Sequence, residues 1–487
     1  MKDSIISYLN SNKHHWWTVG LLPGLYAISY LYHHNYTLVN SWTQFAYLVL
    51  QMIVAPSLIV LLVNHLIKKQ SDRVKNAFNA SAVTILTAIT VSLVIYLGWR
   101  WKGLLLISVI TVVASWFVGK HYKKGVLILG LMTVLSILQF AFYFFTDVLQ
   151  KQNWVTTSPL TTITFQKKPN IYYIQPDGYS AKPALENIHY DYNNDRFYSD
   201  LEQRDFYINH EYRTNYPSTL SSNAALFTGQ HHFYDQGTLK NELFNAREII
   251  MGNNPVLQTF KNNGYQTTAI LQHRYLLLNH PEVAYDRINI SSNELSSLPK
   301  YKLDKNYLSD LKSMMQSASD APQFYFVEIL EPGHIPGLPY KGSSPIKQRE
   351  DYISKLNHTS TKLLQMIDHI TQQDPNSIII IAADHGGFVG FNYATQCYEK
   401  PINDATLKSS IFRALLAVKA PSEFESYKDH LKSSVSLFPT LFYYLGNKSM
   451  KEQNMDNSSY QLIKSGSQGG VYRYYDDHGT SVTEKIL

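Results

Sequence analysis

Long apolar runs, separated by short polar or basic segments, make up most of the first 150 residues. No charged residue lies between Lys13 and Lys68, which is room for two membrane-crossing helices of about 20 residues each. A polar turn is expected between them, near His33–Gln44. Soluble proteins do not place so many such runs in a row with lysines between them. The pattern predicts five transmembrane helices, near Trp17–Tyr32, Phe45–Leu66, Asn76–Trp99, Gly103–Gly119 and Gly125–Thr146.

Basic residues are distributed unevenly among the loops of this region. Residues 1–150 carry eleven Lys and Arg residues, of which nine lie in the N-terminal tail and in the second and fourth loops. Only Arg100 and Lys102 lie in the alternate loops. Because positive loops stay in the cytoplasm, we expect a cytoplasmic N-terminus, an uncleaved first span, and a chain that lies outside after about Leu149. The net charge of +6 thus reflects membrane orientation and not a nucleic-acid partner.

A different pattern begins at Asn170. Short β-branched and aromatic runs alternate with segments of helical period such as Tyr352–Ile370 and Ser434–Leu445. This alternation predicts an α/β domain over residues 170–446, with a mostly parallel sheet covered by helices on both faces. We expect residues 151–169 to form a linker and residues 447–487 to form a polar C-terminal tail. The expected strands are Asn170–Gln175, Tyr265–Leu271, Gln323–Ile329, Ser377–Ala383 and Ala414–Val418.

Carboxylates and imidazoles follow several of the expected strands. Ligands collect beyond the carboxyl ends of strands in such sheets, and an Asp-Gly pair by itself is typical of a turn. Four strand ends with this chemistry instead predict a site for a divalent cation such as Zn²⁺ or Mn²⁺. Cys397 is the only cysteine, which excludes a disulfide within the chain and a cysteine-based zinc site. The residues at the strand ends are Asp177, His273, Glu331, His334, Asp384 and His385.

A hydroxyl-rich segment follows Pro217. The run Leu220–Phe227 can form a helix that Gly229 closes, so Thr219 is expected at its N-terminus, where amides and the helix dipole stabilise an anion. Taken alone, Ser218 or Thr219 could simply cap the helix. Beside a metal, a hydroxyl in this position can attack phosphorus.

The order of these motifs resembles the alkaline phosphatase superfamily, and within it the sulfatase-like membrane enzymes. The five-span anchor is similar to that of lipoteichoic-acid synthases and lipid A phosphoethanolamine transferases. The matching segments, in chain order, are Tyr173–Tyr179, Tyr216–Thr219 with Thr228-Gly229, Asn263–Thr267, Glu331–His334 and Ala383–Gly387.

By position, the resemblance implies that one metal is bound by Asp177, Thr219, Asp384 and His385, with Thr219 as the nucleophile. It also implies that His334 and His273 contact the transferred group. Two departures from the motifs of the superfamily narrow the range of expected activities. The segment after Thr219 lacks the proline and arginine of true sulfatases, and Glu331–His334 lacks the extra Asp that completes a second metal site in two-metal phosphodiesterases.

The resemblance therefore implies transfer of a phospholipid head-group phosphate unit, phosphoglycerol or phosphoethanolamine, to an envelope glycan or lipid through a phosphothreonine. The expected partners are a phospholipid donor, a glycan or lipid acceptor and the membrane, with no nucleic acid. The expected location is the bacterial cytoplasmic membrane, with the catalytic domain on the outer side. Two alternatives are a phosphodiester hydrolase that uses water as the acceptor and a non-catalytic lipid-binding sensor.

Overall fold

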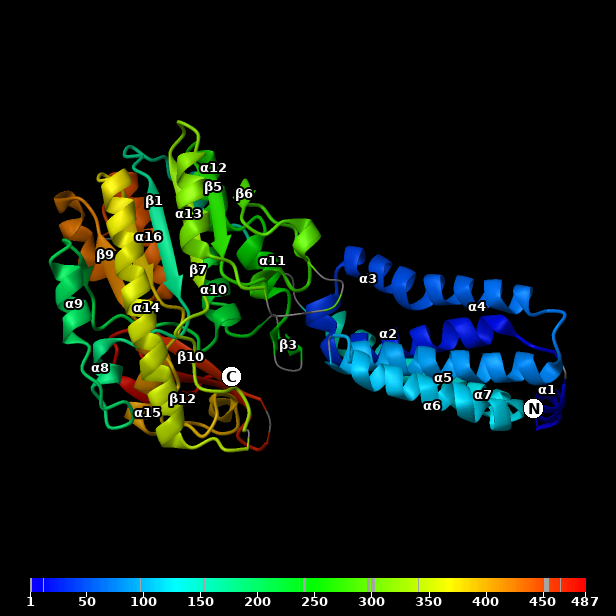
Figure 1. Ribbon diagram of the computed structural model, residues 1–487. Coiled ribbons are helices and arrows are strands. Elements are labelled where there is room, and N and C mark those ends of the chain that lie inside the picture. The colour runs from blue at the N-terminus through cyan, green and yellow to red at the C-terminus, as the bar shows by residue number, and fades with distance from the viewer. Residues whose placement is uncertain are drawn as a thin grey trace.

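The computed structural model describes residues 2–487 except 12, 97, 152–153, 236, 240–241, 296–297, 299–302, 340, 451–454 and 465. Small parts of the predicted third span, linker and tail thus lie outside the described residues. A bundle of long helices, formed by the N-terminal third, extends from one side of an α/β domain (Figure 1).

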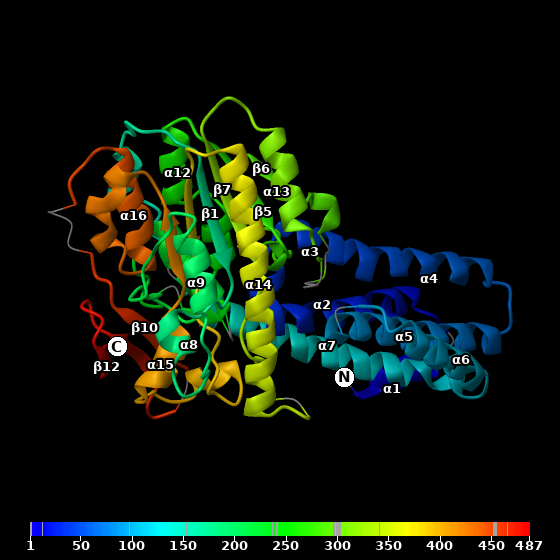
Figure 2. The same cartoon turned by 60° about the vertical axis from the view of Figure 1, so that its left-hand side comes forward.

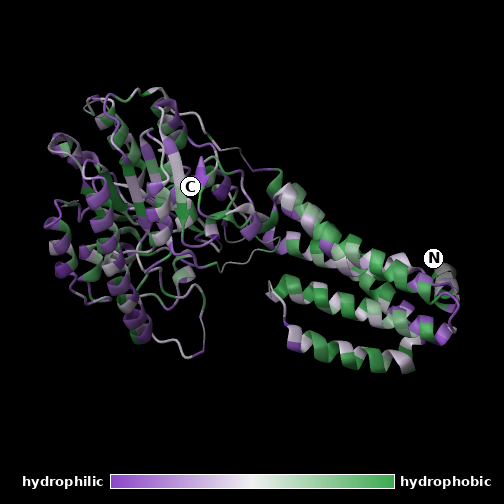
Figure 3. Ribbon diagram, turned by 45° about the horizontal axis from the view of Figure 1, so that its top comes forward, coloured by the Kyte–Doolittle hydropathy of each residue, from purple (hydrophilic) through white to green (hydrophobic). Residues whose placement is uncertain are grey.

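The helices of the bundle are strongly apolar (Figure 3). Their outward side chains are apolar as well, and Leu106 and Phe142 are 62% and 72% exposed, as expected for surfaces in contact with lipid. By length and hydropathy, three stretches in the described part could cross a membrane: Trp42–Leu66, Asp72–Tyr96 and Trp101–Val148. The helical segments are α1 (Lys2–Asn10), α2 (Trp16–Val39), α3 (Trp42–Val49), η1 (Leu50–Val54), α4 (Ala55–Leu66), α5 (Asp72–Tyr96), α6 (Trp101–Val118), η2 (Gly119–His121), α7 (Tyr122–Tyr143) and η3 (Phe144–Val148).

The polar turn expected near His33–Gln44 is shorter than predicted and consists of Asn40 and Ser41. Helix α2 continues to Val39 with one non-helical residue, Asn35 (φ −135°, ψ 35°), and α3 begins only three residues later. The polar side chains do not need a solvated turn, because they form a junction with the α/β domain. Its hydrogen bonds are Thr37 Oγ1 to Glu242 Oε2 (3.0 Å), Asn40 Nδ2 to Asn245 Oδ1 (3.0 Å), Asn279 Nδ2 to Asn40 Oδ1 (3.0 Å) and Gln44 Nε2 to the Leu278 carbonyl (2.8 Å).

A mostly parallel sheet forms the centre of the α/β domain, as predicted. Its seven strands lie in the order β2-β9-β8-β1-β7-β5-β6, and only β9 runs antiparallel to its neighbours β8 and β2. Continuous β-branched and aromatic runs make the long strands, because both of their faces are buried. The strands are β1 (Ile171–Pro176), β2 (Tyr207–Ile208), β5 (Gln266–Leu271), β6 (Arg287–Ile288), β7 (Gln323–Ile329), β8 (Ile378–Ala382) and β9 (Leu416–Lys419).

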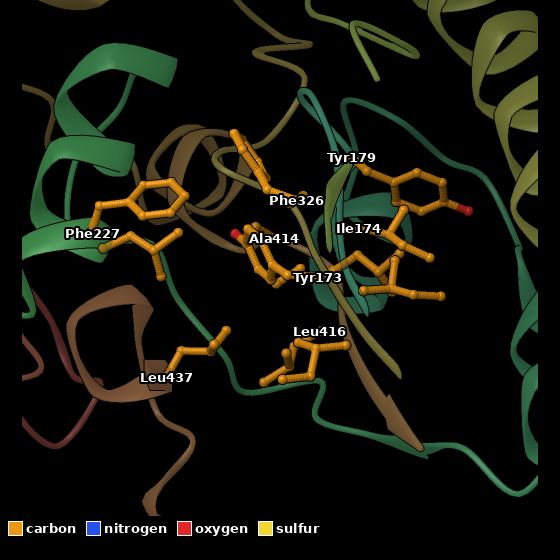
Figure 4. Packing of buried hydrophobic residues seen from close by; sticks show 14 of the residues in the cluster. Tyr173, Ile174, Tyr179, Phe227, Phe326, Ala414, Leu416 and Leu437 are labelled. Atoms are coloured by element: carbon orange, nitrogen blue, oxygen red, sulfur yellow. The ribbon is translucent and has the colours of Figure 1, made fainter. Parts of the chain in front are cut away.

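Helices cover both faces of this sheet (Figure 2). On one face, Tyr173 of β1 and Phe326 of β7 pack against Phe227 of α10 (Figure 4), with ring centroids 5.2–6.5 Å apart. On the other face runs the long helix α14. The helices are α8 (Lys182–Leu185), α9 (Asp195–Glu202), α10 (Thr219–Thr228), α11 (Ala246–Met251), α12 (Pro255–Asn262), α13 (Tyr307–Gln316), α14 (Pro345–Gln373), α15 (Ala405–Phe412) and α16 (Ser434–Leu445).

The segments expected as linker and tail contain ordered structure. In the linker, Leu160, Ile163 and Phe165 are buried in the core of the α/β domain. In the tail, three antiparallel strands form a small sheet: β10 (Ser459–Ile463), β11 (Gly470–Tyr475) and β12 (Ser481–Lys485). This sheet supports the chain just before α10, because the amide of Tyr460 donates to the Asn215 carbonyl (2.8 Å). A two-stranded hairpin, β3 (Thr238–Leu239) and β4 (Glu242–Leu243), lies between α10 and α11.

Candidate metal centre and active site

Two adjacent parallel strands present carboxylates at the same edge of the sheet. β1 is followed directly by Asp177, and Asp384 is the second residue beyond β8. Because β1 and β8 pair in parallel, both side chains leave the carboxyl edge, where ligands bind in such sheets. One potential ligand atom each from Asp177, Asp384 and His385 lies within 4.8 Å of the others. The strand pairing therefore assembles a possible cation site.

The loops that carry these residues are tightly fixed. Gly178 has φ +68°, and a Cβ there would lie 2.2 Å from the carbonyl oxygen of Gly333, so glycine is required. The Gly178 amide donates to Oδ1 of Asp384 (3.1 Å). Tyr352 of α14 donates its hydroxyl to the Gly178 carbonyl (2.8 Å), and its ring packs on Gly387. Tyr352 thus joins the loop after β1 to the loop after β8.

The imidazole of His385 is oriented by its own loop. Its Nδ1 lies 2.8 Å from the Gly386 carbonyl oxygen and must carry the proton to donate there. The lone pair of Nε2 then faces Oδ1 of Asp177 (3.2 Å) and Oδ2 of Asp384 (3.5 Å). These two buried oxygens have no hydrogen-bond donor among the described residues. A buried group of acceptors without a donor fits a divalent cation.

Thr219 adds a hydroxyl to this group. It is the first residue of α10, it is 7% exposed, and its Oγ1 lies 3.3 Å from Nε2 of His385. Ser218 caps the helix in a reciprocal capping box with Ser221. The Thr219 hydroxyl is therefore not used as a cap, and it stands where the first amides of α10 favour an anion.

Burial in this group perturbs all three titratable side chains. Burial is the main cause that raises the pKa of Asp384 to about 6. His385 lowers this pKa in part, and the charge of Asp177 raises it. Burial also raises the pKa of Asp177, against a smaller opposing effect of His385. Burial alone would lower the pKa of His385, but the two carboxylates together raise it above the ordinary value. A bound cation favours the deprotonated form of each ligand.

The two other predicted histidines lie in different surroundings. His334 follows β7, its side chain is exposed, and its ring centroid lies 5.7 Å from that of His385. An imidazole in this position can contact a group bound in front of Thr219. His273 follows β5 and is paired with Asp304 (Nε2 to Oδ1, 3.0 Å). Among the described residues, no hydrogen bond or ion pair joins His273 to the other site residues.

A layer of buried polar side chains lies under the site, and the sequence patterns do not single it out. Glu328 of β7 is the register partner of Gln175 in β1, on the sheet face that α10 covers. On α10, Asn223 lies one turn before Phe227 on the same side of the helix. Glu328 and Asn223 are fully buried, and both polar side-chain atoms of each lack a hydrogen-bond partner among the described residues. The only sequence signal is a Glu within an apolar strand.

Glu328 is strongly perturbed by this environment. Burial, and then the charges of Asp177 and Asp384, raise the pKa of its carboxyl well above the ordinary value. A carboxyl without a partner costs less free energy in its neutral form. The burial of Glu328 therefore favours its neutral form over the carboxylate.

Comparison with known proteins finds similarity at the level of solved structures. No protein-family model and no curated protein matches the chain. The lipooligosaccharide phosphoethanolamine transferase A (EptA) of Neisseria meningitidis is 13% identical, over 87% of this chain and 95% of that one, with a TM-score of 0.43. The zinc complex of the periplasmic domain of EptC from Escherichia coli is 11% identical, over 66% and 96%, with a TM-score of 0.43.

A third similar structure is the lipoteichoic acid synthase LtaP of Listeria monocytogenes. It is 13% identical, over 66% of this chain and 90% of that one, with a TM-score of 0.39. These structures come from the two groups of enzymes that the motif order resembles.

The acceptor group predicts which residues metal binding requires. Asp177→Asn or Asp384→Asn removes an anionic ligand, so we expect the affinity for Zn²⁺ or Mn²⁺ to fall by more than about 100-fold. Asp374→Asn is the matched control, because Asp374 caps the end of α14 and accepts from Asn170 and Tyr172 instead. Metal content is measured by mass spectrometry after dialysis. Stoichiometric metal in Asp384→Asn would contradict the assignment.

The buried Glu328 predicts a pH-dependent stability difference. A folded pKa above the unfolded value stabilises the fold at low pH, and this contribution is lost as the pH rises above the ordinary value of 4.5. We therefore expect metal-free Glu328→Gln to gain stability over the wild type by up to about 1.4 kcal/mol per pH unit above this value. Glu350→Gln, at an exposed position of α14, should show no such trend. Denaturation of the detergent-solubilised proteins from pH 5 to 8 measures the difference, and a flat difference for Glu328→Gln would refute the prediction.

Proposed function

We propose that this chain is a metal-dependent enzyme that transfers a phospholipid head-group phosphate unit, phosphoglycerol or phosphoethanolamine, to an envelope glycan or lipid. The observation that carries the proposal is the position of Thr219 at the N-terminus of α10, with its hydroxyl 3.3 Å from Nε2 of His385 in the group formed with Asp177 and Asp384. A hydroxyl nucleophile, cation ligands and a helix N-terminus in one place suit attack on a phosphodiester. The motif resemblance supports the same class of reaction.

Asp177, Asp384 and His385, together with Thr219, would hold one Zn²⁺ or Mn²⁺. When bound, such a cation lowers the pKa of a neighbouring hydroxyl and neutralises charge on phosphoryl oxygens. The described residues contain one group of this kind. This is in line with a single-metal transferase.

Each side chain of the site then has its own role in the reaction. Oγ1 of Thr219 attacks phosphorus, the bond from phosphorus to the lipid alcohol breaks, and a phosphothreonine remains. The first amides of α10 hold a phosphoryl oxygen. The exposed His334, beside His385, lies where its ring can contact the transferred group. His273 can join it only after its ion pair with Asp304 opens. An acceptor hydroxyl finally displaces Thr219 from phosphorus.

The two alternative functions depart from head-group transfer at different steps. A hydrolase would form the same phosphothreonine and resolve it with water, so the products decide between hydrolysis and transfer. A non-catalytic sensor would have no need of a nucleophile beside a complete ligand group. The presence of both at this site favours catalysis.

We also propose a five-span topology in the bacterial cytoplasmic membrane. The candidate stretch Trp101–Val148 contains two helices, α6 and α7, between which the chain turns at η2. Together with α2, the α3–α4 segment and α5, they make five long helices in the bundle. Nine of the eleven basic residues of the first 150 lie in the N-terminal segment, in the α4–α5 connection with the start of α5, and in η2 with the start of α7. The N-terminus and the α4–α5 connection lie at the end remote from the α/β domain (Figure 1). This arrangement supports an outer location of the catalytic domain, which we take to span residues 170–446 with the β10–β12 sheet attached.

The mechanism predicts a covalent intermediate on one residue. Thr219→Ala should abolish turnover and phosphopeptide formation, because it removes the nucleophile. Ser218→Ala removes the helix cap, so we expect a stability loss of about 1 kcal/mol but continued modification of Thr219. The purified protein is incubated with phosphatidylglycerol or phosphatidylethanolamine, quenched in acid and analysed by peptide mass spectrometry. A phosphate unit on Ser218, or wild-type turnover in Thr219→Ala, would overturn the mechanism.

The topology predicts where reporter fusions are active. An export-dependent reporter enzyme fused after Gln150 should be active, because this position follows the last helix of the bundle. The same reporter fused after Gln70, in the basic α4–α5 connection, should be inactive. The reverse pattern would refute the orientation.

A further inference from the structure

An apolar groove of about 460 Å³ lies in the helical bundle, between α2, α3 with η1, and α7. Its volume is in the range of small-molecule binding sites. Most of its wall is apolar or aromatic and comes from residues that recur along one side of each helix. These residues include Ile28, Tyr32, Phe45, Ile53, Ile137 and Phe140.

The groove exists because α2 and its neighbour touch at one end and diverge at the other. A Cβ on Gly24 would lie 2.0 Å from the Met52 carbonyl oxygen, and one on Gly20 would lie 2.7 Å from Cα of Ser57. The two backbones are thus in direct contact there. Further along α2, Tyr32 faces Phe45 of α3 with ring centroids 5.9 Å apart. Large side chains hold the helices apart and leave the groove between them.

Few polar groups line the groove: Asn40, Ser41, Ser29 and the hydroxyls of Tyr32 and Tyr36. Asn40 and Ser41 line the end next to the α/β domain, where Asn40 bonds to Asn245. Deeper in the groove, Tyr32 is 8% exposed and its hydroxyl has no hydrogen-bond partner among the described residues. A buried donor without a partner favours a ligand that brings an acceptor to it. The groove therefore suits an amphiphile with a polar end, an acceptor below it and an apolar tail.

The polar end of the groove leads toward the candidate active site. The segment that leaves the carboxyl end of β5 descends to the bundle, where the Leu278 carbonyl accepts from Gln44 and Asn279 bonds to Asn40. This is the sheet edge that carries Asp177 and Asp384. The polar end of the groove is thus joined to a segment that begins at the same sheet edge as the metal centre.

We propose that this groove binds the phospholipid donor, with an acyl chain between α2, α3 and α7, an ester carbonyl at the Tyr32 hydroxyl and the head group directed to Thr219. The proposal rests on the proposed function and names its substrate-binding site in the membrane. An acyl chain gains no hydrophobic free energy when it moves from the bilayer into such a groove. The groove therefore acts by positioning the phosphodiester for attack.

A pair of variants on one helix tests the groove. Ile137→Trp fills it from α7, whereas Leu138→Trp adds the same ring at a neighbouring, 60% exposed position that does not line it. Full-length protein in phosphatidylcholine nanodiscs receives phosphatidylglycerol with a photoreactive diazirine on one acyl chain. We expect labelled peptides from α2, α3 and α7 in the wild type and in Leu138→Trp, and a loss of this labelling in Ile137→Trp. Equal labelling in the two variants would overturn the proposal.

Turnover gives a second measurement on the same proteins. The rate with phosphatidylglycerol is divided by the rate with glycerophosphoglycerol, a phosphodiester without acyl chains. We expect this ratio to fall roughly ten- to hundredfold in Ile137→Trp relative to Leu138→Trp, and less in Tyr32→Phe, which removes only the hydroxyl. An unchanged ratio in both groove variants would contradict the proposal even if one of them folds poorly.

The experiments distinguish a wrong assignment of the groove from a wrong proposed function. If phospholipid labels Thr219 but Ile137→Trp does not alter the ratio or the photolabelling, the function stands and the groove assignment is wrong. If the groove is photolabelled and unlabelled phosphatidylglycerol competes, while Thr219 never becomes modified, the groove stands and the transfer mechanism is wrong.

Discussion

The structure of the site depends on two buried carboxylates that lie close together beside one imidazole. Asp177 and Asp384 face the same lone pair of His385, and the hydroxyl of Thr219 faces it too. Such a group is unfavourable in a protein interior unless positive charge enters it. Rigid loops keep it assembled, because Tyr352 and the close approach of Gly178 to Gly333 prevent the carboxylates from turning toward solvent. The packing of these loops thus holds the side chains in an arrangement that suits a cation.

The same unfavourable electrostatics extends one layer below the site. Glu328 and Asn223 are buried without partners between β7 and α10, directly behind the residues that we assign to catalysis. Burial and the charges of Asp177 and Asp384 raise the pKa of Glu328, which favours a form without negative charge next to the two carboxylates.

Hydrogen bonds attach the α/β domain to the helical bundle. The junction uses side chains near the end of α2 and the start of α3, together with the segments around Glu242 and Leu278. These contacts fix the α/β domain to the bundle and hold the segment that follows β5 against the start of α3.

The sequence by itself determined the apolar runs, the five long strands and the residues at the strand ends, because these follow from periodicity and from the chemistry of single side chains. Only the tertiary structure decided that α2 continues past His33, that β10–β12 form a sheet and that His273 pairs with Asp304. It also decided that Glu328 is buried behind the site and that a groove opens beside Tyr32. The physical reason is that a polar residue is expected from sequence to be exposed to solvent. Its actual burial and its hydrogen-bond partner depend on segments that are far away in the chain.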